Sequence, residues 1–178
     1  MRAWLAPLVL GVLAIAVVAY VVVGSQTAKP TAAAPGEYVA GLKRSPGTFK
    51  ESSIDVGAQL STLGEPDVTI DVDVMRPVFL PTVITVKQGQ VVRLRLHGKD
   101  NGLEDMPELQ GALGLHEFSG HGFQIFGPYD VWITGIRKGV TKEVIFRASV
   151  AGEFQFECVV FCSPNHYAML GKLVVEER

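Results

Sequence analysis

The sequence predicts an all-β sandwich domain that follows a single N-terminal transmembrane helix. Two patterns carry this prediction. A long apolar segment without charged residues opens the chain, and short segments of alternating polar and apolar residues fill the part beyond residue 65. Alternation with a period of two is typical of half-buried strands, and a series of such strands separated by turns favours a sandwich of two sheets.

The apolar segment covers residues 3–24. As a helix it would be about 33 Å long, enough to cross a bilayer core of about 30 Å. Arg2 is the one charge before it, which favours a cytoplasmic N-terminus and a domain on the extracytoplasmic (periplasmic or outer) face. We therefore expect residues 1–24 to anchor the chain in a membrane. A cleaved signal peptide, whose apolar core is shorter at roughly 7–15 residues, is the alternative.

Residues 25–64 are expected to form a tether and a linker. Their first part, residues 25–36, is small and Pro-rich, which is typical of flexible tethers, and the remainder has no clear periodicity. The domain itself then covers residues 65–178. A net charge of −2 provides no basic surface for nucleic acid, so nucleic-acid binding is excluded as a function.

Eight strands are predicted in the domain, and a turn at residues 87–90 predicts that the second and third form a hairpin. A polar loop over residues 97–119 is long for a compact domain, which indicates either an insertion with a function of its own or a short helix around residues 105–113. The predicted strands cover residues 67–75, 82–86, 91–96, 122–125, 131–134, 141–147, 152–158 and 171–176.

A cluster of sulfur and nitrogen donors lies between the last two predicted strands. The pattern C-x3-C-x3-H-x2-M is formed by Cys158, Cys162, His166 and Met169. Cys158 and Cys162 are the two cysteines of the chain. Thiolate and imidazole ligands with a weak thioether are typical of copper sites that transfer electrons. Because two thiolates can bridge two metal ions, the cluster indicates a binuclear copper centre.

A second imidazole must come from elsewhere in the chain. His121 begins a predicted strand, in which Phe123 and Ile125 alternate toward the core, and this places it at an end of the sandwich. His116 and His97 lie in or beside the long polar loop. We favour His121 and keep the other two as alternatives.

Other uses of the same residues stay open. Two cysteines outside the cytoplasm most often form a disulfide. A mononuclear copper site could use Cys162, His166, Met169 and His121, which would leave Cys158 spare. Zinc ribbons, c-type haem and iron–sulfur clusters need other spacings or more cysteines.

The chain resembles the CuA domains of the cupredoxin family, which occur in subunit II of haem–copper oxidases and in nitrous oxide reductase. The resemblance covers about residues 66–177 and is specific in two places, the pattern over residues 158–169 and His121-Gly122-Phe123. It implies a cupredoxin-like Greek-key β-sandwich. It departs from the oxidase pattern at Ser163, where oxidase subunits usually have Gly, in the long loop before His121, and in lacking a tryptophan-rich stretch.

The resemblance also implies a ligand set for two copper ions. Cys158 and Cys162 would bridge both ions through their thiolates. One ion would be completed by His121 and Met169, and the other by His166 and the backbone carbonyl of Val160. Three aromatic side chains would cover the site, those of Phe123, Phe161 and Tyr167.

The function implied is electron transfer, with this chain as the electron-accepting, subunit II-like part of a haem–copper oxidoreductase of the cytochrome c oxidase type. The expected partners are a haem-containing integral membrane catalytic subunit, and cytochrome c or a small copper protein as donor. No catalytic residues are expected here. The alternatives are a free-standing membrane-tethered carrier, a subunit of a nitric oxide reductase and a copper-handling protein. Acidic residues of the loop could attract a basic partner: Asp100, Glu104, Asp105 and Glu108.

Overall fold

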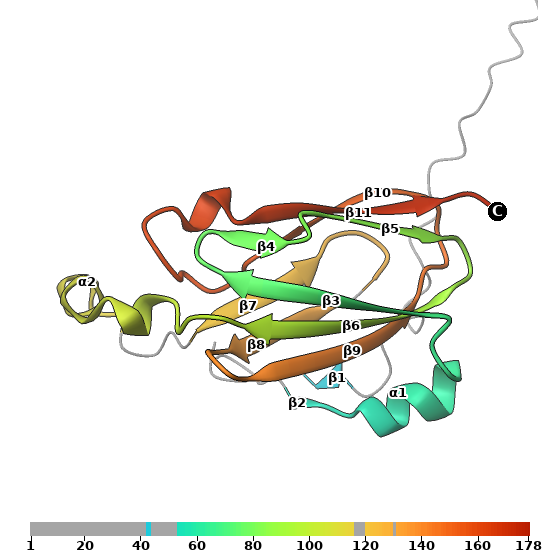
Figure 1. Cartoon of the computed structure of the whole chain (residues 1–178), viewed down its shortest axis with the longest axis horizontal. Helices are drawn as coiled ribbons and strands as arrows, with labels where there is room; N and C mark the ends of the chain where they lie inside the picture. Colours follow the sequence, from blue (N-terminus) through green and yellow to red (C-terminus); the bar gives the residue numbers. More distant parts are fainter. Residues whose placement is uncertain (1–41, 44–52, 116–119, 130) are drawn as a thin grey trace, which may run out of the picture.

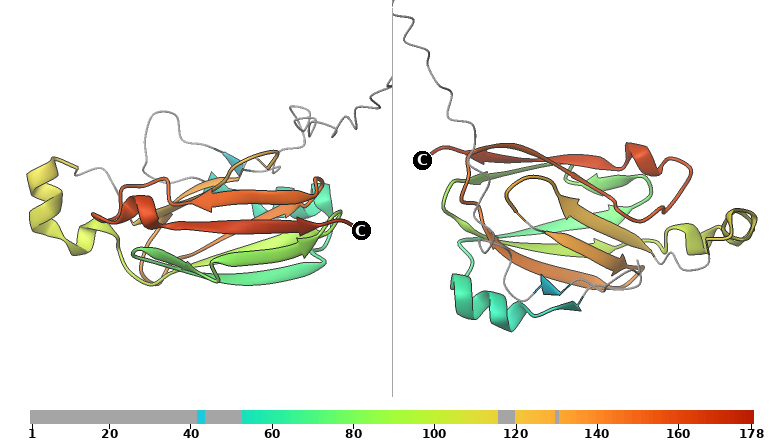
Figure 2. Two further views of the ribbon diagram at one scale, coloured as in Figure 1. Left: turned by 90° about the horizontal axis from the view of Figure 1, so that it is seen from above. Right: turned by 180° about the vertical axis from the view of Figure 1, so that it is seen from behind.

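The computed structural model describes residues 42–43, 53–115, 120–129 and 131–178. Within them, one sheet of five strands and one of four face each other across an apolar core (Figure 1 and Figure 2). The predicted all-β sandwich is thereby confirmed. The expected membrane anchor and the tether at residues 25–36 lie outside the described residues. No helix in the described ranges is both long and apolar enough to cross a bilayer.

The four-stranded sheet has the order β4-β3-β6-β9. β3 and β6 run parallel, and the other neighbours are antiparallel. Alternation directs one face of each strand inward, because Val72 and Val74 of β3 and Leu94 and Leu96 of β6 are fully buried. The strands are β3 (Val68–Met75), β4 (Val78–Leu80), β6 (Val91–Gly98) and β9 (Thr141–Arg147).

The five-stranded sheet has the order β5-β11-β10-β7-β8. β5 runs parallel to β11, and the remaining neighbours are antiparallel. β10 lies between β11 and β7. The strand that leads into the last connection, β10, is therefore the direct neighbour of the strand that begins at His121, β7. The strands are β5 (Val83–Lys87), β7 (His121–Ile125), β8 (Trp132–Ile136), β10 (Gly152–Glu157) and β11 (Leu170–Glu176).

The predicted hairpin between β5 and β6 is wrong. β5 pairs with β11, whereas β6 pairs with β3 and β9 in the other sheet. The turn after Lys87, closed by a bond from Gln90 N to the Lys87 carbonyl, therefore carries the chain from one sheet to the other. Both strands still bury alternate residues against the opposite sheet, so their polar–apolar pattern is the same as that of a hairpin.

Three phenylalanines join the two sheets directly below the donor cluster. Phe79 on β4 packs edge-on against Phe123 on β7 and Phe156 on β10, with ring centroids 5.5 and 5.4 Å away. Phe123 and Phe156 are themselves 5.2 Å apart. Since Phe123 lies two residues after His121 and Phe156 two before Cys158, this packing fixes the strands that carry the donors.

Part of the stretch expected to be a linker is folded onto the domain. β1 (Leu42–Lys43) pairs with β2 (Ser53–Ile54), and α1 (Val56–Leu63) packs beside β9 (Figure 1). Asp55 caps α1 by accepting a bond from Ala58 N at 2.8 Å. The buried Gln59 side chain accepts from Ile145 N at 2.9 Å, so α1 protects an edge strand that would otherwise leave this amide open.

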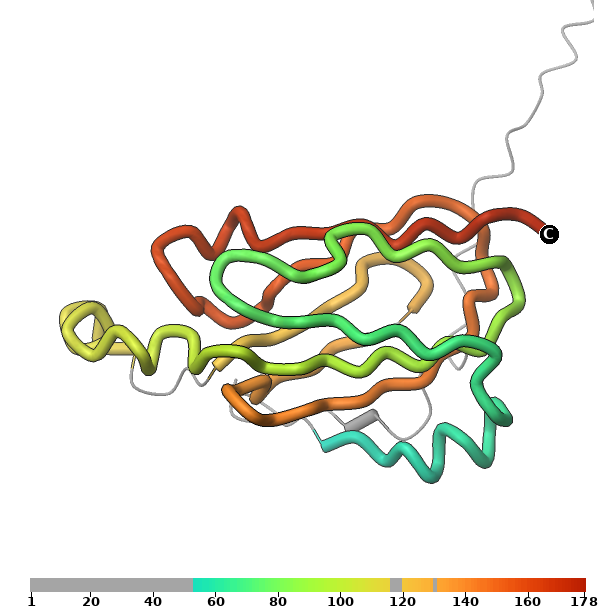
Figure 3. The backbone as a smooth tube through the Cα atoms, viewed as in Figure 1, coloured from blue at the N-terminus to red at the C-terminus, as the bar shows by residue number. Residues whose placement is uncertain are grey.

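The short helix predicted around residues 105–113 is confirmed, and it lies in an insertion between β6 and β7. The loop after β6 contains η1 (Leu103–Asp105) and α2 (Pro107–Leu113), and none of the α2 residues is buried. α2 projects from the same end of the sandwich as the connection between β10 and β11, which carries η2 (His166–Ala168) (Figure 3).

We expect Phe79→Ala to lower the free energy of unfolding by about 3–5 kcal/mol, because it opens a cavity beside the two other fully buried rings of this cluster. Tyr167→Ala is the matched control. Its ring is 81% exposed, so the change should stay within about 0.5 kcal/mol. Urea denaturation of the full-length variants measures both, and equal effects would contradict this account of the core.

Candidate metal centre

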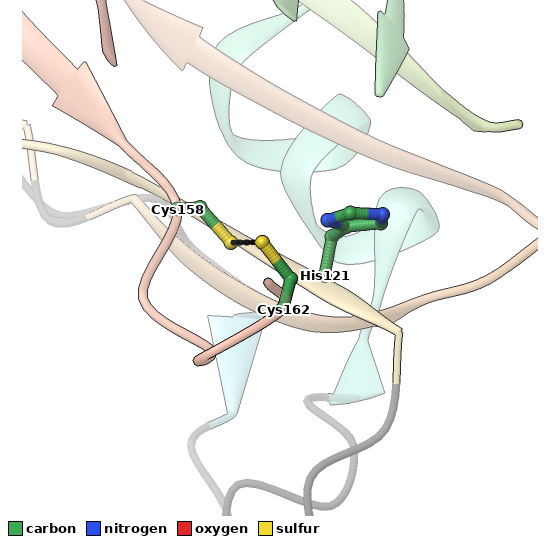
Figure 4. A group of neighbouring side chains, drawn as sticks. All are labelled: His121, Cys158 and Cys162. Carbon is green, nitrogen blue, oxygen red and sulfur yellow. Dashed lines mark hydrogen bonds between the residues drawn. The ribbon is translucent and has the colours of Figure 1, made fainter. Parts of the chain in front are cut away.

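The structure brings the donors predicted from the sequence together at one end of the sandwich. Cys158, Cys162, His166 and Met169 lie on the connection between β10 and β11, and His121 begins β7, the neighbour of β10. Figure 4 shows the two sulfurs pointing at each other with the His121 ring beside them. Ligand atoms of His121, Cys158 and Cys162 all lie within 4.8 Å of one another.

Cys162 is at the centre of the cluster. Its Sγ lies 3.8 Å from the Cys158 Sγ, 3.6 Å from the Met169 Sδ and 3.9 Å from the His166 Nδ1. A disulfide has an S–S length of about 2.05 Å, and both cysteines are free. The pair is therefore available as two separate thiol ligands.

The Val160 carbonyl also faces the cluster. Its oxygen lies 3.1 Å from the Cys158 Sγ, and Val160 itself is fully buried. The carbonyl oxygen is thus within reach of the place where an ion held by the sulfurs would lie, as the resemblance implies.

Most of the site is closed to water. Cys158, Cys162, His121 and Met169 are buried, whereas His166 is partly exposed. The site therefore combines a dry interior with one imidazole that reaches the surface.

The geometry favours His121 over the other two candidate histidines. Its Nδ1 is buried and has no hydrogen-bond partner, which is unusual for a buried polar atom and leaves this nitrogen free to bind a metal ion. His97 is instead bonded to Asp71 and Thr141, and His116 lies outside the described residues.

Asp100 sets the orientation of His121. Its carboxylate accepts hydrogen bonds from His121 Nε2 at 2.8 Å, from Gly102 N at 2.7 Å and from Arg76 N at 2.8 Å. Arg76 Nε lies 3.2 Å from the same carboxylate. Burial alone would raise the pKa of Asp100, but the Arg76 and Gly102 amides and His121 outweigh it and lower the pKa. An ionised carboxylate only accepts, so Nε2 keeps its proton toward Asp100. Once Nδ1 is deprotonated, its lone pair faces the cluster, as a metal ligand requires.

The role of Asp100 corrects the expectation that it is a solvated acid available to a partner. Its side chain is 19% exposed and is paired within the domain. Asp105 likewise pairs with Arg76 at 3.4 Å. Because Asp100 and His121 are 21 residues apart in the chain, no local spacing in the sequence signals their contact.

Two glycines hold the ends of the insertion together. Gly102 and Gly120 form an isolated parallel bridge, and a Cβ on Gly102 would lie 2.3 Å from the Gly120 carbonyl oxygen. Gly102 also has φ +60°, a conformation that favours glycine. This close approach places Asp100 next to His121 although the insertion separates them.

The position after His121, Gly122, leaves no room for a side chain. Its amide donates to the Cys158 Sγ at 3.4 Å. A Cβ at this position would lie 2.4 Å from the Val159 side chain and 3.1 Å from that of Val160. The connection carrying the cysteines can therefore pack directly on the β7 backbone.

The two thiols differ in acidity. The Cys158 thiol donates to Cys162 and, despite burial, lowers the pKa of Cys162 to about 4, with further contributions from His121 and His166. Burial and the neighbouring Cys162 raise the pKa of Cys158 well above its ordinary value. Burial would lower the pKa of His121, but Cys162 and Asp100 raise it. A metal ion must displace the Cys158 proton, because thiolates are the ligands.

The expected aromatic cover is confirmed only in part. Phe123 is fully buried beneath the site, and Phe161 lies partly exposed with its ring centroid 5.6 Å from that of His166. Tyr167 is 81% exposed, and its ring centroid lies 5.3 Å from that of His166. It therefore covers the imidazole from the solvent side and does not reach the buried sulfurs.

No family model matches this sequence, and no curated protein matches it. Solved structures do show likenesses. Auracyanin B has 20% identity and a TM-score of 0.42 over 62% of this chain and 90% of its own. A chain of a heme-copper terminal oxidase dimer has 23% identity and a TM-score of 0.45, over 62% and 65%. An oxidized amicyanin mutant has 17% identity and a TM-score of 0.37, over 60% and 81%. Likenesses at these values do not decide what the site binds.

We expect the metal-free, full-length chain to show ultraviolet thiolate absorbance at neutral pH that is lost on acidification with a midpoint at about pH 4, because the pKa of Cys162 is lowered to about 4. Cys162→Ser should remove this signal. Cys158→Ala should move its midpoint to higher pH, since it removes the donor that most lowers the pKa. Absence of thiolate at pH 7 in the unsubstituted chain would contradict the prediction.

Proposed function

We propose that this chain transfers electrons through a binuclear CuA copper centre. The observation that carries the proposal is the pair of free, buried cysteines with Sγ atoms 3.8 Å apart, beside an imidazole nitrogen that has no other partner. The proposed ligands are His121, Cys158, the Val160 carbonyl, Cys162, His166 and Met169.

The chemistry of the donors supports copper. Thiolates and a thioether are soft ligands that select copper, and imidazole also suits it. Four cysteines for an iron–sulfur cluster or paired ligands for a zinc ribbon are absent from the sequence. Cys158 lies against Cys162 and the Val160 carbonyl, which supports two ions over a mononuclear site that would leave Cys158 unused.

When bound, the copper pair would accept one electron and pass it on. The residues of this chain hold the ligands in one arrangement. Cys158 N donates to the Met169 carbonyl at 3.1 Å, and Met169 N donates to the His166 carbonyl at 3.0 Å, so the connection is closed on itself between β10 and β11. A ligand loop fixed in this way changes little between oxidation states, and burial excludes water from the sulfurs.

His166 is the proposed port through which electrons enter or leave. It is partly exposed, and Tyr167 beside it is 81% exposed. Further exposed apolar side chains come from the β4–β5 connection and the start of β11, those of Leu80, Val83 and Leu170. β5 and β11 pair in parallel with Val83 opposite Lys172, so Val83 and Leu170 lie at the same end of the sheet. An apolar surface here suits a transient redox partner.

The proposed host is a membrane haem–copper oxidoreductase of the cytochrome c oxidase type, in which this chain is the subunit II-like electron acceptor. Residues 1–24 would anchor it with the domain on the extracytoplasmic face, cytochrome c or a small copper protein would be the donor, and a haem-containing membrane subunit would receive the electron. Co-purification of such a subunit with the full-length chain supports this role. Its absence would favour a free-standing membrane-tethered carrier.

We expect the full-length chain loaded with copper to hold two ions and to give the multiline paramagnetic resonance pattern of a mixed-valence pair. Cys158→Ser should convert this pattern to that of a single copper or abolish binding, because it removes one bridging thiolate. Metal analysis and paramagnetic resonance measure both effects. One copper in the unsubstituted chain, or an unchanged spectrum in the variant, would contradict the binuclear centre.

We expect Asp100→Asn to weaken copper binding about 10–100-fold, the usual cost of losing a residue that orients a metal-bound histidine. Asp71→Asn is the matched control, since Asp71 also bonds a histidine, His97, but is not part of the proposed site. Competition with a copper chelator measures both affinities. Equal losses in the two variants would show that the Asp100 bond is not specific to metal binding.

A further inference from the structure

We infer that the Ser163 hydroxyl donates a hydrogen bond to the Cys162 sulfur when the metal is bound, and that this bond raises the reduction potential of the centre. The inference rests on the proposed copper function. Ser163 is no ligand, so its effect is exerted through Cys162.

Ser163 is a polar residue inside the closed part of the site. It is 5% exposed, and its Oγ lies 4.0 Å from the Cys162 Sγ, at the outer range of a contact with sulfur. A buried hydroxyl needs a partner, because leaving it unbonded costs free energy. Its backbone is held by a bond from His166 N to the Ser163 carbonyl at 3.0 Å. This bond fixes the backbone at Ser163, and the 4.0 Å distance places its hydroxyl toward the Cys162 sulfur.

Coordination of Cys162 allows only one direction for this bond. A coordinating cysteine is a thiolate and has no proton to give. A serine hydroxyl can rotate to donate or to accept, so with metal bound it must be the donor. The bond would draw electron density from the Cys162 sulfur.

Each of the two cysteine sulfurs then has its own donor. Cys158 receives the Gly122 amide at 3.4 Å, which belongs to the backbone and cannot be removed by a side-chain change. The donor to Cys162 would be the Ser163 side chain, which a single substitution can remove without changing a ligand. Hydrogen bonds to sulfur are among the features that set potentials in metal centres. Ser163 is thus a position at which this sequence tunes the proposed centre.

The test compares Ser163→Ala with the unsubstituted full-length chain after loading with Cu(II). Copper content should stay the same. The midpoint potential should fall, so that the ratio of reduced to oxidised centre at the original midpoint drops about fivefold, the fold-change that corresponds to the typical net contribution of one hydrogen bond. The sulfur-to-copper absorption should move to longer wavelength, and the coupling of one exchangeable proton to the electron spin should be lost.

Two further variants separate tuning from packing. Ser163→Thr keeps the hydroxyl and should restore the potential, the absorption and the proton coupling. Ser61→Ala removes an exposed serine of α1 and should change none of them. If Ser163→Ala does not fold, Ser163→Gly makes the same comparison.

The possible failures can be told apart. Full copper content with an unchanged potential, absorption and proton coupling in Ser163→Ala overturns the role of Ser163 and leaves the copper function intact. An unsubstituted chain that binds no copper overturns both.

Discussion

The pairing of β10 with β7 is the constraint on which the site depends. Glu157 lies opposite Gln124 and Phe156 opposite Ile125, so the residue after β10 and the residue that begins β7 reach the same end of the sheet. Cys158 and His121 become neighbours for this reason alone. β11 lies on the other side of β10 and returns the connection, which places Cys162, His166 and Met169 over the same point.

The three packed phenylalanines and the Asp100 network act on this arrangement at different levels. The rings of Phe79, Phe123 and Phe156 hold the two sheets together below the donors and so fix the backbone. Asp100 then selects one orientation of His121 and keeps a proton on its Nε2. Packing provides the positions of the ligand atoms, and a charged hydrogen bond provides the direction in which one of them points.

The insertion between Asp100 and His121 is joined to the site through a narrow base. The Gly102–Gly120 bridge closes it, and Arg76 holds both Asp100 and Asp105. Beyond this base, α2 has no buried residues and projects at the end of the sandwich that carries the proposed electron port (Figure 1). The ligand geometry can therefore stay constant while the projecting helix varies in sequence.

The sequence by itself determined most strands of the sandwich and the cluster of donors between the last two. Period-two alternation and the C-x3-C-x3-H-x2-M pattern are local, so the sandwich and this cluster could be predicted, whereas the short strand β4 was missed. The partner of each strand depends on which apolar faces meet across the core, so the hairpin between β5 and β6 was mispredicted. The orienting role of Asp100 and the exposure of Tyr167 also had no local signal. Contacts between residues far apart in the chain, and the direction of a side chain on a turn, are decided only when the two sheets pack.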